Sequence, residues 1–193
     1  MNRQVDTDCQ GIENTQLICC LQGQIYIELP RSWSRLPDEA AAEKFPYRAK
    51  PQEVYGDPEA DRLLTLNLLE KPLQEKQVYP AICEMQRLIS HLYPESIRDT
   101  ARLIKSGEST AGYFLFITGG IDHDTCHAMF LRPIHERMMM GGYHFPTGQT
   151  IENKAAFLGI LKSVHTDTEE GAVQHNGQNR IRGQNDTGAQ SKI

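Results

Sequence analysis

Hydrophobic and polar residues alternate with a period of two along several short segments of the chain. Leu64, Leu66 and Leu68 alternate with Thr65 and Asn67, as expected for a strand that buries one face. The same analysis predicts a hairpin around Gln22-Gly23, a second hairpin that ends in residues 62–70, and later strands at about 98–105, 112–118, 125–132 and 137–145.

A helical period replaces this alternation in two longer segments. In the first, one apolar stripe repeats every three or four residues and consists of Val78, Ile82, Met85, Ile89 and Leu92. Pro94 ends this helix, which we expect at 78–93. A second helix is predicted at 152–164, and residues 38–45 favour one or two helical turns.

The order of the elements predicts the fold class. Two hairpins, a long helix, a strand meander and a closing helix are typical of an α+β domain, in which helices pack on an antiparallel sheet. The polar ends, residues 1–15 and 166–193, are too poor in apolar residues to fold by themselves and are predicted to be disordered. A single folded domain is therefore expected at 16–165.

The composition of the chain limits the kinds of partner that it is expected to bind. The formal net charge is −5 and the basic residues are scattered, which argues against nucleic-acid binding. No stretch approaches the ~18 apolar residues that a membrane-spanning helix needs, and the N-terminus has no signal-peptide core. Five cysteines without C-x-x-C spacing fit reduced thiols. We expect a cytoplasmic protein.

The segment from Asp122 to His127 is the strongest candidate for a metal or catalytic site, because it concentrates two aspartates, two histidines and a cysteine. His123 and His127 would share a face only if the strand at 125–132 began earlier, and they would then lie roughly 13 Å apart, too far to chelate one ion. Asp122 and Asp124 suit a turn, where aspartate side chains bind nearby backbone amides. We therefore interpret the segment as a turn and predict no metal, no cofactor and no catalytic residues.

Candidate partner-binding residues are Trp33, Met138, Met140 and Tyr143. Consecutive methionines suit an adaptable binding surface. On an alternating strand, however, two of the three methionines 138–140 belong to one packed face. Trp33, the sole tryptophan, is expected to fill the sheet beside Pro30, with a partner contact as the alternative.

Three segments resemble the PsbP-like and DcrB-like superfamily. They are "GQIYIELPRSW", "FPYRAKPQEVYGDPEADRLLTLNLLEKPL" and "YHFPTGQTIENKAAFLGILKSV", and the resemblance covers about residues 25–164. It implies layers of antiparallel sheet and helices that serve mainly as binding modules, among them photosystem subunits, a GTPase-binding nuclear-import factor and type VI secretion adaptors. No catalytic residues are shared across that superfamily, and the absence of a signal peptide favours its cytosolic adaptors.

The sequence thus predicts a non-catalytic adaptor or chaperone-like module that binds another protein, linked to bacterial secretion by the resemblance. A homodimer is compatible with the sequence. The alternative is a small hydrolytic or metal-dependent enzyme that uses His123, Asp124 and His127. A pocket where these side chains converge would favour the enzyme, whereas an apolar groove or an open strand edge would favour the binding module.

Overall fold

The computed structural model of the chain describes residues 14–46, 50–59, 61–120 and 123–167. Its strands are β1 (Thr15–Cys20), β2 (Ile25–Pro30), β3 (Ser34–Arg35), β4 (Glu53–Gly56), β5 (Leu63–Pro72), β6 (Ile97–Arg98), β7 (Arg102–Ser106), β8 (Ser109–Thr118), β9 (Thr125–Ile134) and β10 (Arg137–Pro146). Its helices are α1 (Asp38–Lys44), α2 (Val78–Leu92) and α3 (Thr150–Ser163), and single 3-10 turns, η1 (Glu75–Gln77) and η2 (Thr147–Gln149), precede α2 and α3.

Eight strands form one antiparallel sheet in the order β3-β4-β5-β10-β9-β8-β6, with β7 also paired to β8. The remaining strands, β1 and β2, form a separate hairpin. Its connection contains Leu21, Gln22 and Gly23, all with positive φ, which confirms the turn predicted at Gln22-Gly23. The α+β class and both long helices are confirmed as well.

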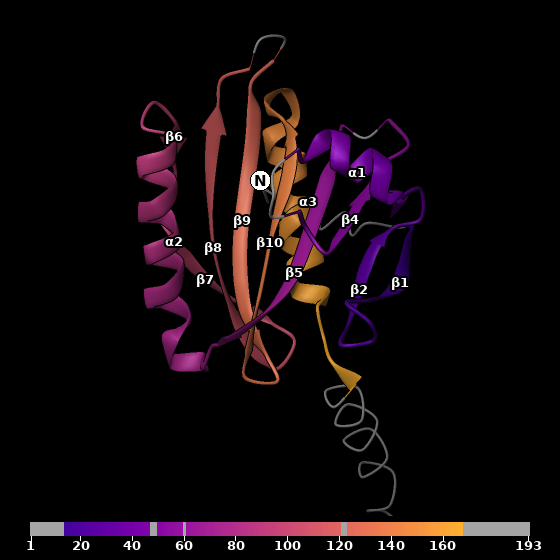
Figure 1. Ribbon diagram of the computed structural model, residues 1–193, viewed down its shortest axis with the longest axis vertical. Coiled ribbons are helices and arrows are strands. Elements are labelled where there is room, and N and C mark those ends of the chain that lie inside the picture. The colour runs from indigo at the N-terminus through magenta and orange to yellow at the C-terminus, as the bar shows by residue number, and fades with distance from the viewer. Residues whose placement is uncertain (1–13, 47–49, 60, 121–122, 168–193) are drawn as a thin grey trace, which may run out of the picture.

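The sheet is covered on its two faces by different elements (Figure 1). Helix α2 packs on β8 and β9, while α3 and the β1–β2 hairpin lie on the opposite face. Two hydrophobic clusters fill these layers. The cluster under α2 contains Leu73, Val78, Ile82, Ala101, Phe114, Phe116, Leu131 and Met138. The larger cluster on the α3 face includes Ile25, Ile27, Leu29, Trp33, Phe130, Tyr143 and Phe157.

The central strands approach closely at one glycine. A Cβ on Gly141 of β10 would overlap the carbonyl oxygen of Thr65 on β5 and the ring of Phe130 on β9. The Phe130 ring therefore occupies the space that a side chain at 141 would need. This arrangement joins β5 to β10 in the middle of the sheet, although the two strands are far apart in sequence.

Two details differ from the sequence prediction. The strand expected at 98–105 is split into β6 and β7. Leu92 is 61% exposed. The predicted apolar stripe repeats every 3.5 residues on average, whereas an α-helix has 3.6 residues per turn. The stripe therefore shifts around the helix by ~20° per heptad, and Leu92, its last member, lies outside the buried face.

Regular contacts are present at both predicted domain boundaries. Thr15 pairs with Pro30 in the first hairpin, and Thr166 is buried. The backbone of His165, the residue before Thr166, exchanges two hydrogen bonds with the backbone of Tyr26. A single domain at 16–165 stays a prediction. Residues 1–13 and 168–193, on which most of the disorder prediction falls, lie outside the described residues. No helix within the described part is long and apolar enough to cross a membrane.

Candidate functional site

The segment from Asp122 to His127 spans the end of a connection and the start of a strand. Strand β8 ends at Thr118 and β9 begins at Thr125, so the turn interpretation agrees with His123 and Asp124, whereas Cys126 and His127 belong to β9; Asp122 lies outside the described residues. His123 and Asp124 are exposed, whereas Cys126 is buried in the cluster on the α3 face. Among the described residues, no group of three or more histidines, cysteines or acidic residues is placed to hold a metal ion.

His127 finds its partner on the neighbouring strand instead. Its Nδ1 lies 2.8 Å from Nδ1 of His144 on β10, and its Nε2 lies 2.8 Å from the hydroxyl of Thr118 on β8. The rings of Phe116 and Phe45 pack on His127 and His144 respectively. Burial lowers the pKa of His127 to about 4; burial, together with the nearby His127, lowers the pKa of His144 to about 3. Both rings are therefore neutral at pH 7.

The four residues predicted to bind a partner lie mostly inside the domain. Trp33 and Tyr143 are stacked on each other in the cluster on the α3 face, and Met138 is buried under α2. Met140 is half-buried and packs against the same cluster as Met138. Met138 and Met140 thus share a packed face, as expected for alternation. In this conformation only Met140 is accessible, and a partner-binding role for the four stays a prediction.

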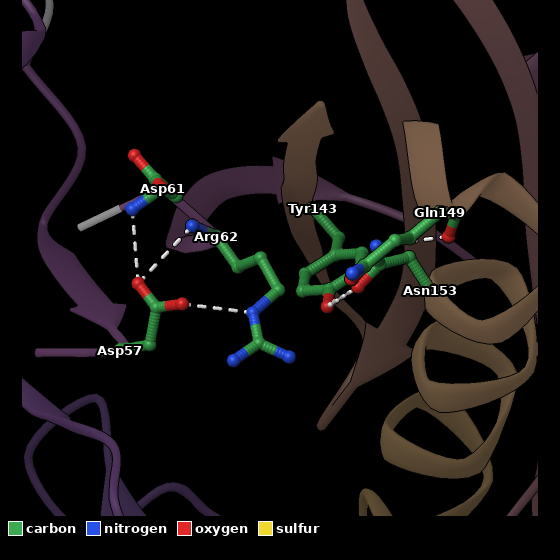
Figure 2. Close-up of polar contacts among 6 residues, drawn as sticks. All are labelled: Asp57, Asp61, Arg62, Tyr143, Gln149 and Asn153. Atoms are coloured by element: carbon green, nitrogen blue, oxygen red, sulfur yellow. Dashed lines mark hydrogen bonds and ion pairs between the residues drawn. The ribbon is translucent and has the colours of Figure 1, made fainter. Parts of the chain in front are cut away.

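A cleft of about 530 Å³ opens beside the buried Tyr143. It separates the loop between β4 and β5 from the segment that joins β10 to α3 (Figure 2). Its lining residues are Asp57, Glu59, Asp61, Arg62, Pro146, Gly148, Gln149 and Asn153. We refer to this set of residues as the acidic cleft.

One wall of the acidic cleft is organised by a buried carboxylate. Asp57 Oδ1 accepts hydrogen bonds from the backbone N–H groups of Asp61 at 2.9 Å and Arg62 at 3.2 Å. Its other oxygen accepts the Arg62 Nε–H at 2.8 Å (Figure 2). Only 3% of the Asp57 side chain is exposed. Such a charge-assisted network fixes the loop and orients the guanidinium, whose terminal nitrogens make no hydrogen bond to other described residues.

The opposite wall is built from a chain of neutral hydrogen bonds (Figure 2). The Tyr143 hydroxyl donates to Asn153 Oδ1 at 3.0 Å, and Asn153 Nδ2 donates to the Gln149 carbonyl at 2.9 Å. Burial raises the pKa of Tyr143 to about 12, so its hydroxyl keeps its proton. The first turns of α3 are thereby attached to the sheet. Trp33, stacked behind Tyr143, supports the same wall from inside the core.

The charges of the acidic cleft determine what it can bind. Three carboxylates and one guanidinium line it, and the exposed carboxylates are those of Glu59 and Asp61. Among the described lining residues there is no histidine, cysteine, serine or lysine. The excess of carboxylates suits electrostatic binding of a cation.

The sequence interpretation missed this site. It predicted a hairpin that ends in residues 62–70 and gave no role to the acidic stretch before it, because such stretches are common on protein surfaces. The signal available was Asp57 followed by Arg62 across that stretch. The opposite wall could not be placed, because Asn153 faces the loop only through the pairing of β5 with β10.

Comparisons with known proteins identify the fold. No protein-family model and no curated protein matches the chain. Among solved structures, cyanobacterial PsbP (CyanoP) from Synechocystis sp. PCC 6803 aligns with a TM-score of 0.57 at 10% identity, over 82% of this chain and 95% of that one. The Ran-binding protein Mog1p of Saccharomyces cerevisiae aligns with a TM-score of 0.52 at 11% identity, over 79% and 95%.

The chain has a PsbP-like fold. A protein from Bacteroides thetaiotaomicron VPI-5482 also aligns, with a TM-score of 0.54 at 8% identity; the match covers 78% of this chain but only 47% of that one. At such identities the likeness establishes the PsbP-like fold alone. Of these three proteins, Mog1p is the one whose name states a protein partner.

Proposed function

We propose that this PsbP-like protein is a non-catalytic binding module that holds a positively charged segment of another protein in the acidic cleft. The observation that carries the proposal is the charge of the lining. Asp57, Glu59 and Asp61 contribute three negative charges against the single positive charge of Arg62. Because Arg62 is already bound to Asp57, the exposed carboxylates of Glu59 and Asp61 face solvent without a described ion-pair partner.

A protein segment fits this cleft better than a buried small molecule does. The cleft is open, four of its lining residues are charged, and the side chains of Glu59 and Asp61 are exposed. Small-molecule sites are usually enclosed and mostly apolar. Lysine or arginine side chains of a docked segment can reach Glu59 and Asp61, and backbone carbonyls can accept from the free edge of Arg62.

The fold supports a protein partner in a general way. Mog1p, a protein of the same fold, is named as Ran-binding. We extend the proposal to a cytoplasmic, adaptor or chaperone-like role, which the resemblance in sequence implies. The link to bacterial secretion through DcrB-like proteins belongs to the same proposal and rests on that resemblance alone.

Charge reversal in the acidic cleft tests the proposal. A labelled lysine-rich peptide serves as the probe, and its affinity for the full chain is measured by fluorescence anisotropy. We expect Glu59→Lys/Asp61→Lys to weaken binding by about tenfold or more, because like charges then face each other. Binding to the unaltered chain should also weaken as salt is raised.

The matched control is Glu43→Lys/Glu108→Lys, which makes the same change of net charge at exposed positions outside the cleft. This variant should retain most of the affinity. If both double variants weaken binding equally, the peptide responds to net charge and the acidic cleft is not its site. Equal affinity of the unaltered chain for an uncharged peptide would also overturn the proposal.

A further inference from the structure

Helix α2 carries an ordered stripe of exposed residues beside its buried face. Glu84, Leu88 and Leu92 follow one another at intervals of four residues, so they lie in one row along the helix. Leu88 is 59% exposed and Leu92 61% exposed. Tyr93 and Ile97, which follow the helix, are also exposed. Large contiguous apolar patches commonly mark interaction sites.

A basic group completes the row at the end of α2. Arg98 reaches back to the helix terminus, where its Nη1 donates to the Tyr93 carbonyl at 3.0 Å and to Ser96 Oγ at 2.9 Å. The Arg98 guanidinium is therefore held at the C-terminal end of α2, beyond Leu92. Along the stripe the order is one acidic group, two leucines and one basic group. Glu84 also forms an ion pair with Arg87, three residues further along the same helix.

This order is self-complementary. In a two-fold dimer each interface residue meets its counterpart in reverse order. With the axis between Leu88 and Leu92 and the two α2 helices antiparallel, Leu88 of one copy lies against Leu92 of the other. Glu84 then faces the C-terminal end of α2 in the other copy, where the Arg98 guanidinium is held. One arrangement thus satisfies two leucine contacts and two ion pairs.

We propose that the α2 stripe, defined as Glu84, Leu88, Leu92 and Arg98, binds a second copy of the chain and forms an antiparallel two-fold dimer. Rows of residues spaced by four are the ridges through which helices commonly pack. The charges at the two ends of the row select this partner and this direction, because a parallel pairing would bring Glu84 against Glu84 and Arg98 against Arg98. The inference does not depend on the acidic cleft, to which none of these four residues contributes.

The mass of the full chain in solution is the first test. Sedimentation velocity over about a hundredfold range of concentration should show a monomer–dimer equilibrium, because dimerisation follows mass action. Leu92→Glu should give a monomer throughout that range. The control, Ile151→Glu, alters an even more exposed apolar residue (82%) on α3 and should leave the dimer intact. Thermal unfolding of each variant verifies that it is folded.

Charge exchange is the second test and is specific to the antiparallel arrangement. Glu84→Arg and Arg98→Glu should each weaken the dimer, by about tenfold or more, since every change acts twice across the axis. The double variant should recover most of the lost affinity. A monomeric unaltered chain at all concentrations overturns the dimer, and a double variant as weak as both changes combined overturns the pairing. A retained dimer in Leu92→Glu places the interface elsewhere.

Discussion

At the scale of single residues, the most unusual contact is the hydrogen bond between His127 and His144. A hydrogen bond between two Nδ1 atoms needs one proton between them, so the pair accommodates at most one imidazolium. Thr118 continues the chain at the other nitrogen of His127. The aromatic rings of Phe45 and Phe116 border the pair, and among the described residues no acidic side chain forms an ion pair with either histidine.

The pair should make the fold sensitive to acid. The pKa values of His127 and His144, about 4 and about 3, lie below their ordinary value of 6.5. The unfolded chain therefore binds protons first, and the folded state loses stability as the pH falls from 6.5 toward 4, while nothing changes above 6.5. We expect a slope approaching about 1.4 kcal/mol per pH unit for each histidine.

Urea unfolding between pH 7.5 and pH 4.5, in about half-unit steps, measures this slope from the linkage relation. The double variant His127→Gln/His144→Gln keeps hydrogen-bonding groups but cannot titrate, so its stability should fall less steeply. His91→Gln, on the exposed side of α2, is the control and should keep the steep dependence. Equal slopes in all three proteins would contradict the role of the pair.

At the scale of elements, the β9–β10 hairpin turns through two residues that are poorly suited to the conformation. His135 and Glu136 have φ of 47° and 63°, and this left-handed conformation is strained for residues with a Cβ. Two-residue turns with both φ values positive favour Asn-Gly. The turn is also a contact point, because the Glu136 carbonyl accepts the Leu73 N–H at 2.8 Å. That backbone bond is independent of the side chain at 136.

Replacing the turn residues should therefore stabilise the protein. We expect His135→Asn/Glu136→Gly to raise the free energy of unfolding by about 1 kcal/mol, since it relieves the strain at two positions. Chemical denaturation measures the change. Glu108→Gly is the control in the β7–β8 turn, where φ at 108 is not positive, and should be neutral or destabilising. A loss of stability in the Asn-Gly variant would refute the explanation.

This same hairpin shows how far the sequence allowed the elements to be predicted. Alternation correctly located β9 and β10, and a two-residue turn pairs positions at equal distances from it. His127, eight residues before His135, thus opposes His144, eight residues after Glu136. The histidine pair was therefore within reach of sequence reasoning that fixed the register. The pairing of β5 with β10 was not, because no local pattern specifies which distant strands become neighbours.

At the scale of the whole molecule, the PsbP-like sheet separates two surfaces with different chemistry. The acidic cleft begins at the β4–β5 loop, toward one edge of the sheet, and the α2 stripe lies over the opposite edge near β6. A dimer through the stripe would leave both clefts open, so the two proposals are compatible and separately testable. Both proposals require α2 and α3 to stay packed on the two faces of the sheet.

A buried arginine holds the α3 face together. Arg132 of β9 is 1% exposed, and its Nη1 donates to Ser106 Oγ on β7 at 3.1 Å and to the Val164 carbonyl just beyond α3. Ser106 Oγ in turn donates to the Leu161 carbonyl. These bonds attach the end of α3 to β7 and β9. Arg132 is the donor to both the Val164 carbonyl and Ser106 Oγ.

Arg132→Leu should lower the free energy of unfolding by about 3 kcal/mol. The substitution keeps an apolar stem but leaves the Val164 carbonyl without its donor and removes one bond of Ser106; a buried polar group without a partner costs about 1–3 kcal/mol. Arg102→Leu, on the exposed part of β7, is the control and should change stability by less than about 0.5 kcal/mol. Hydrogen exchange should show the loss most strongly at the end of α3. If Arg132→Leu behaves like Arg102→Leu, hydrophobic packing alone holds α3 on the sheet.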